Sequence, residues 1–72
     1  MSKLAGVSGR QAVRAFERAG FVAAKEEGSH VTLKKAGSPI LVIPLHREVS
    51  PYLLRSQIKR AGLTTAKFLE LI

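Results

Sequence analysis

The 72 residues make one small domain, residues 1–72, of a size that buries only roughly 60% of the surface its unfolded form exposes. The chain has no cysteine, which excludes disulfides, and its two histidines have no cluster of metal ligands around them. Twelve Lys and Arg against five Glu and no Asp give a net charge of +7, which favours a polyanion such as nucleic acid as partner over a surface that is basic for solubility alone.

The start of the chain, MSKLAGVSGRQ, lacks the long apolar stretch of a signal peptide. The longest apolar run, ILVI, is far shorter than the roughly 18 residues of a membrane span. Together with the absence of cysteine, these features predict a soluble protein of the cytoplasm with no membrane partner.

Residues 8–19 are predicted to form the first helix. Ser8 can cap it, Gln11 stands three residues later as in a capping box, and Gly20 supplies the left-handed stop. Apolar residues recur at helical spacing to form a buried stripe. The stripe consists of Ala12, Val13, Phe16 and Ala19, whereas Arg10, Arg14, Glu17 and Arg18 lie off it.

Three short strands are predicted next, at residues 21–26, 30–35 and 40–44. The turn EGS joins the first two, and KAGSP joins the second to the third. The second strand alternates clearly: Val31 and Leu33 point to the core. His30, Thr32 and Lys34 therefore share the opposite, outward face.

The third strand carries apolar side chains on both faces. With Leu41 and Ile43 inward, Ile40 and Val42 are left on the outer face. Two interpretations stay open: a contact surface, for a homodimer or another partner, and a strand that is covered on both sides.

A second helix is predicted from Pro51 to Ala61, with Ser50 as its cap and Gly62 as its end. Leu54, Ile58 and Ala61 form one side, and the other side consists of Tyr52, Arg55, Ser56, Lys59 and Arg60. The net charge favours phosphate contact by Arg55, Lys59 and Arg60 over a plain solvated face. Thr64 caps a short last helix, which docks through Phe68, Leu69 and Ile72.

This order predicts an α+β fold, α-β-β-β-α(-α), with a three-stranded antiparallel sheet and helices packed on one face. Double-stranded RNA-binding domains have the same order of elements. Because fold order is weak evidence for function, the chemistry of the residues has to carry the argument.

The residue inventory excludes most hydrolytic chemistries. A magnesium site needs converging carboxylates, but Glu26 and Glu27 are adjacent on a strand and so point to opposite faces. Zinc needs at least three good ligands, which two histidines do not supply. There is no glycine-rich phosphate loop and no cysteine nucleophile, so neither a metal nor a cofactor is expected.

Histidine among cations suits one reaction, the cleavage of RNA. RNA carries its own nucleophile, the 2′-hydroxyl, so a catalyst need only transfer protons and stabilise charge on the phosphorane. Histidine can do the first near neutral pH, and lysine or arginine the second. The residues alone allow two roles for His30, a solvated turn residue or a catalytic group.

The other candidates have ordinary structural roles as well. Gly28 fits the positive φ of a hairpin turn, and it would also let a phosphate approach the backbone. Lys34 and Lys35 are either edge-strand charges that discourage aggregation or RNA contacts. His46, in the loop after Pro44, is either structural or a second group at the site.

Three segments, in this order, resemble the HicA-like (YcfA) mRNA interferase toxins of toxin–antitoxin systems. They are SGRQAVRAFERAGFV, GSHVTL and VIPLHREVSPYLLRSQIKRAGLTTAKFLELI, which together cover nearly the whole chain. The resemblance implies a fold like a double-stranded RNA-binding domain, endonucleolytic cleavage of mRNA that blocks translation, and inhibition by a cognate HicB-type antitoxin that covers the active site.

The same resemblance places catalysis on His30, within a turn shaped by Gly28 and Ser29. The sequence departs from the family at one position, because many members have a second histidine directly after the first and Val31 stands there instead. With His30 alone, the acid and base roles are shared with RNA, water or a second residue, and His46 and Lys34 are the candidates for that residue.

Three functions follow for comparison. The first is a metal-independent endoribonuclease toxin in which His30 transfers protons and Lys34, Lys35, Arg55, Lys59 and Arg60 bind phosphates. The second is a binding module that holds RNA without cutting it. The third is a DNA-binding subunit that places its second helix in a major groove.

Overall fold

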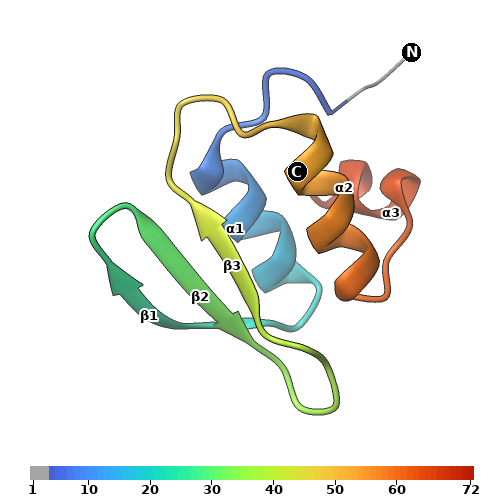
Figure 1. Cartoon of the computed structure of the whole chain (residues 1–72). Helices are drawn as coiled ribbons and strands as arrows, with labels where there is room; N and C mark the ends of the chain where they lie inside the picture. The colour runs from blue at the N-terminus through green and yellow to red at the C-terminus, as the bar shows by residue number, and fades with distance from the viewer. Residues whose placement is uncertain (1–3) are drawn as a thin grey trace.

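The computed structural model describes residues 4–72 and contains the predicted order of elements (Figure 1). They are helix α1 (Gly9–Arg18), strands β1 (Val22–Glu27), β2 (His30–Lys34) and β3 (Leu41–Pro44), and helices α2 (Pro51–Arg60) and α3 (Thr65–Leu71). The predicted α+β class with a three-stranded antiparallel sheet is confirmed. The predicted domain, residues 1–72, starts with three residues outside the described range.

The sheet has the order β1-β2-β3, with both pairs antiparallel. His30 lies opposite Glu27 on one side and Pro44 on the other. The register of β1 against β2 shifts between Ala23 and Lys25, which marks a bulge in β1. Val31 and Leu33 are buried and His30 and Lys34 are exposed, so the predicted alternation of β2 is confirmed.

Helix α1 begins and ends as predicted. The Ser8 hydroxyl accepts a hydrogen bond from the Gln11 amide, and the Gln11 side chain accepts one from the Ser8 amide, which completes the capping box. After Ala19 the chain turns through Gly20, whose φ of +103° suits glycine. The buried side of α1 consists of Gly9, Ala12, Ala15 and Phe16.

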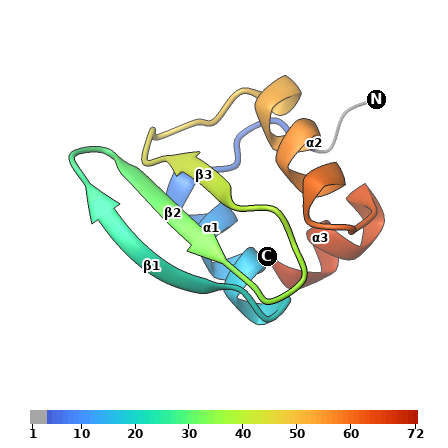
Figure 2. The ribbon, with the colours of Figure 1, turned by 60° about the horizontal axis from the view of Figure 1, so that its bottom comes forward.

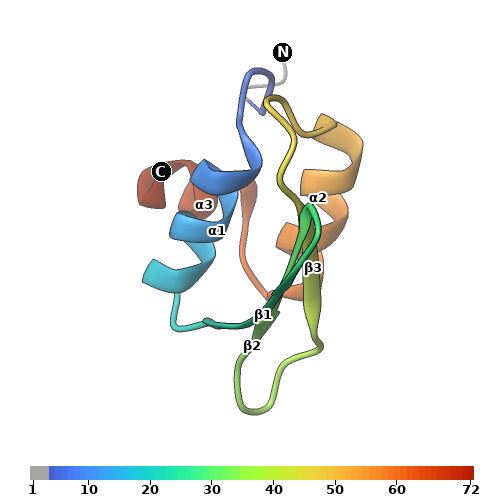
Figure 3. The ribbon, with the colours of Figure 1, turned by 90° about the vertical axis from the view of Figure 1, so that its left-hand side faces the viewer.

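Helix α1 covers the inner face of the sheet and α3 lies beside α1 (Figure 3), and α3 also contacts α2. Phe16 is the centre of this packing, with its ring centroid 5.1 Å from that of Phe68 and 6.0 Å from that of Phe21. Each fully buried side chain of this size contributes about 1.5–3 kcal/mol. One continuous core therefore joins the sheet to all three helices.

Helix α2 lies along the outer edge of β3 (Figure 2). The Val42 amide donates to Gln57 Oε1 at 3.3 Å, and the Arg60 guanidinium donates to the Ile40 carbonyl at 2.9 Å. These side chains satisfy the backbone groups that an edge strand would otherwise expose. The Ile40 and Val42 side chains remain 48% and 44% exposed, so residues 4–72 leave both of them partly open to solvent.

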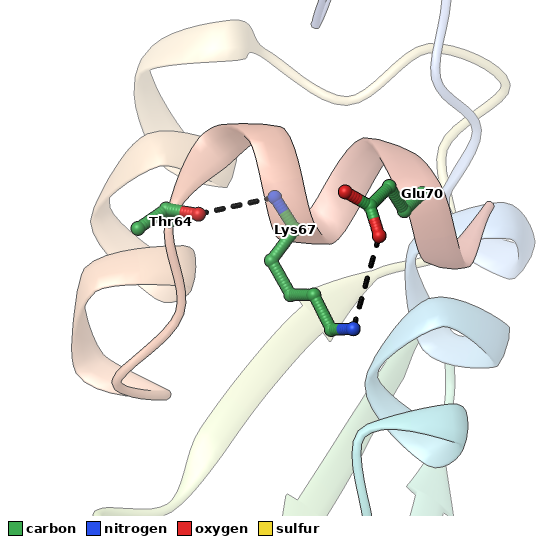
Figure 4. Close-up of polar contacts among 3 residues, drawn as sticks. All are labelled: Thr64, Lys67 and Glu70. Atoms are coloured by element: carbon green, nitrogen blue, oxygen red, sulfur yellow. Dashed lines mark hydrogen bonds and ion pairs between the residues drawn. The ribbon is translucent and has the colours of Figure 1, made fainter.

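The two C-terminal helices start differently. Thr64 caps α3 by accepting a hydrogen bond from the Lys67 amide, and an ion pair of 3.8 Å joins Lys67 to Glu70 (Figure 4). Ser50 is the N-cap residue of α2, as predicted, but its side chain makes no capping hydrogen bond. Pro51 at the first helical position needs no donor partner, which reduces the need for a cap there.

Helix α3 packs on the core mainly through Phe68. Phe68 is fully buried and Leu69 partly so, as predicted, whereas Ile72 is 40% exposed and stays at the edge of the core. Within residues 4–72 no helix has the length and apolar character needed to cross a membrane.

Candidate nucleic-acid interface

The turn between β1 and β2 is built by Gly28 and Ser29. Gly28 has a φ of +59°, as predicted for a glycine in this hairpin. A Cβ at this position would meet no atom within 4 Å, so the space above the turn is open. The glycine thus serves the backbone conformation and leaves room for a ligand beside the turn.

This turn is fixed to the chain that follows β3. The Leu45 amide donates a hydrogen bond of 2.6 Å to the Ser29 carbonyl, and the Gly9 amide donates one of 2.9 Å to the His46 carbonyl. The β1–β2 turn, the end of β3 and the start of α1 therefore meet at one end of the molecule.

His30 is the first residue of β2 and presents its imidazole to solvent on the outer face of the sheet. Its cross-strand neighbour Glu27 forms an ion pair of 3.7 Å with Lys25. The His30 side chain takes part in none of the hydrogen bonds or ion pairs found among residues 4–72. The imidazole is thus free to exchange protons with a ligand.

His46 lies two residues beyond β3, at the same end of the molecule as His30. Its backbone carbonyl accepts the hydrogen bond from Gly9, so its backbone has the structural role that the sequence allowed. The side chain is exposed. Structural and chemical roles are therefore compatible at this residue.

Lys34 and Lys35 lie at the other end of β2, four or more residues from His30, or about 13 Å along an extended strand. Lys34 is exposed. The Lys35 ammonium donates to the Ala19 carbonyl at 2.9 Å and lies 5.5 Å from the centroid of the Phe21 ring. Lys35 therefore stabilises the C-terminal end of α1.

The basic side chains of α2 likewise fall into two groups, one that bonds to the backbone and one that is free. Arg60 is held by the Ile40 carbonyl, whereas Arg55 and Lys59 are exposed and make no hydrogen bond or ion pair within the described chain. Arg55 lies about 200° around the helix from Gln57, which faces β3. The free cations of α2 thus point away from the sheet, and the fold does not gather all predicted cations around His30.

Arg10 and Arg14 of α1, which the sequence analysis assigned only to the side of the helix away from its buried stripe, lie close to the β1–β2 hairpin. Arg10 and Arg14 of α1 line a hollow together with Glu26 of β1, Val31 of β2 and Leu45. Their spacing of four residues puts them on one side of the helix. That spacing was the available signal, but only the packing of α1 against the sheet shows what the two side chains face.

Among residues 4–72, no three His or Glu side chains form a group that could hold a metal ion. The exposed groups at this end include the imidazoles of His30 and His46, the Glu27 carboxylate beside His30, and the nearby Arg10 and Arg14.

The sequence matches one protein-family model, described as the HicA toxin of bacterial toxin–antitoxin systems, over residues 9–63. A search of curated proteins gave no match. The matched range contains both histidines, the whole sheet, α1 and α2. Since it covers well over half of the sequence, the chain belongs to the HicA toxin family of bacterial toxin–antitoxin systems.

Proposed function

We propose that the protein is an endoribonuclease toxin that cleaves mRNA in the cytoplasm without a metal ion and so blocks translation. The observation that carries the proposal is an exposed imidazole, that of His30, held on a turn that a hydrogen bond fixes to the end of β3. Membership of a toxin family supports an activity directed at a cellular polymer. The net charge of +7 makes an anionic polymer the favoured substrate.

In the proposed reaction His30 removes the proton from the 2′-hydroxyl of the RNA. The 2′-oxygen then attacks the adjacent phosphorus, and the bond from phosphorus to the 5′-oxygen breaks. The products are a 2′,3′-cyclic phosphate and a 5′-hydroxyl, which forms when the leaving oxygen takes up a proton. The RNA supplies the nucleophile, its 2′-hydroxyl, so the protein supplies proton transfer and charge stabilisation.

The leaving oxygen needs a proton donor, and His46 is better placed for it than Lys34. His46 lies at the same end of the sheet as His30, whereas Lys34 is about 13 Å further along β2. Gly28 and Ser29 position the turn, and Lys34, Lys35, Arg55, Lys59 and Arg60 are proposed to contact more distant phosphates. The proposed inhibitor is a HicB-type antitoxin that covers His30.

The test is cleavage of a single-stranded RNA by the purified protein in EDTA. We expect cleavage to persist, and His30→Ala to reduce it by about 10²–10⁴-fold because general acid–base catalysis is lost. His46→Ala is expected to reduce cleavage by a factor in the same range. Unfolding curves check that each variant stays folded, which the exposure of both side chains favours.

Cleavage by a folded His30→Ala variant at the original rate would remove His30 from the mechanism. Salt-dependent RNA binding by the unmodified protein without any product fragments would favour a binding module instead.

A further inference from the structure

A hollow of about 240 Å³ lies between α1 and the β1–β2 hairpin, on the inner side of the sheet. Its floor is apolar and includes Val13, Val31 and Leu45, which are buried or partly buried. Its rim is charged and exposed, and consists of Arg10, Arg14, Glu17 and Glu26. An apolar floor with a few polar groups around it is the usual form of a small-ligand site.

In the described residues, no ion pair joins the four charged side chains of the rim to one another. The ion pairs found among residues 4–72 join Lys25 to Glu27 and Lys67 to Glu70, so none involves the rim. Arg14 and Glu17 stand three residues apart on α1, a spacing at which helical ion pairs can form, but no ion pair joins them in residues 4–72. Both arginines and both carboxylates therefore remain available to a ligand.

The hollow lies directly behind the turn that carries His30. Glu26 is paired with Val31 across the hairpin, and Glu27 with His30. Adjacent strand residues point to opposite faces, so Glu26 and Val31 face the hollow while His30 faces outward. Leu45 of the floor is bonded to Ser29 of the turn. An RNA strand that crosses the open turn would pass from one face to the other.

The chemistry of the rim selects among the bases. A carboxylate only accepts hydrogen bonds, so Glu17 and Glu26 favour a base edge that presents donors. Guanine presents two donors side by side, N1–H and N2–H₂, whereas uracil presents a single N–H between two carbonyl oxygens. The apolar floor suits the flat ring of an unpaired base, and Arg10 and Arg14 suit its phosphates.

We propose that this hollow is a subsite for an unpaired guanine next to the phosphodiester cut at His30, an inference that rests on the RNA-cleaving function proposed above. Glu26 accepts from the guanine edge, and Arg10 and Arg14 bind the flanking phosphates. The subsite gives the nuclease a base preference that its exposed histidine cannot provide.

Mapping of cut sites in an RNA of mixed sequence tests the proposal. We expect cuts beside guanine to be favoured about tenfold over cuts beside uracil, and Glu26→Gln to remove this preference. Glu27→Gln is the matched control, because it makes the same charge change one residue away on the opposite face. It is expected to keep the preference, whatever its overall rate. Equal preference in both variants, or no preference in the unmodified protein, would overturn the subsite.

A second measurement separates this inference from the proposed activity. Backbone NMR shifts of the His30→Ala variant are followed during titration with guanosine 5′-monophosphate and, separately, uridine 5′-monophosphate. Larger shifts with the guanosine nucleotide at Val13, Val31 and Leu45 are expected. If the protein cuts no RNA but shows these shifts, the nuclease proposal fails and the base site stands. If it cuts RNA but shows the same small shifts with both nucleotides, the base site fails alone.

Discussion

The two outer strands of the sheet are held in very different ways. In β3, Leu41, Ile43 and Pro44 are buried, and Gln57 and Arg60 of α2 bond to its outer edge. In β1, all six residues are exposed, and the strand lies on the side of the molecule away from α2 and α3 (Figures 1 and 2). Stability is therefore concentrated around β3, and the β1–β2 hairpin is available for binding.

The largest expected difference is in the unfolding free energy lost when one side chain is shortened in β3 and one in β1. Leu41→Ala should cost about 2–5 kcal/mol of unfolding free energy, because Leu41 is fully buried and its loss leaves a cavity. Val22→Ala should change it by no more than about 0.5 kcal/mol, because Val22 is 65% exposed. Urea unfolding of both variants measures this, and equal losses would contradict the division between the strands.

A smaller difference is expected between two glycines, Gly9 of α1, which packs against the end of β3, and Gly28 of the β1–β2 turn. A Cβ at Gly9 would overlap the Pro44 carbonyl oxygen and lie 2.7 Å from the Leu45 Cα, so Gly9→Ala should cost about 1–3 kcal/mol. At Gly28 the space is open, and only the positive φ opposes a side chain. Gly28→Asn should cost less, because Asn tolerates that conformation. Thermal unfolding compares them, and a costlier Gly28→Asn would show that the turn is packed more tightly than described.

The sequence predicted well what depends on local pattern. The alternation of His30 to Lys34 gave the inward and outward faces of β2, and the Ser8 and Gln11 pair gave the start of α1. The opposite directions of Glu26 and Glu27 also followed from strand geometry alone, and the register confirms them.

Contacts between segments that are distant in the sequence could not be predicted from it. Lys35 reaches the Ala19 carbonyl and Arg60 the Ile40 carbonyl, so two cations predicted to bind RNA also hold the fold together. The hollow at Arg10 and Arg14 exists only because α1 packs beside the hairpin. No local sequence pattern encodes these contacts, because they depend on how the helices and strands pack against one another.

Changing the substrate shows whether His30 activates the 2′-hydroxyl of the RNA. Two oligonucleotides are compared that differ only by a 2′-deoxy sugar at the mapped cut site, and the ends of the products are identified. We predict a 2′,3′-cyclic phosphate and a 5′-hydroxyl from the all-ribose strand, and no cut at the deoxy position. Cleavage at the deoxy position at an equal rate would show that the 2′-hydroxyl is not the nucleophile.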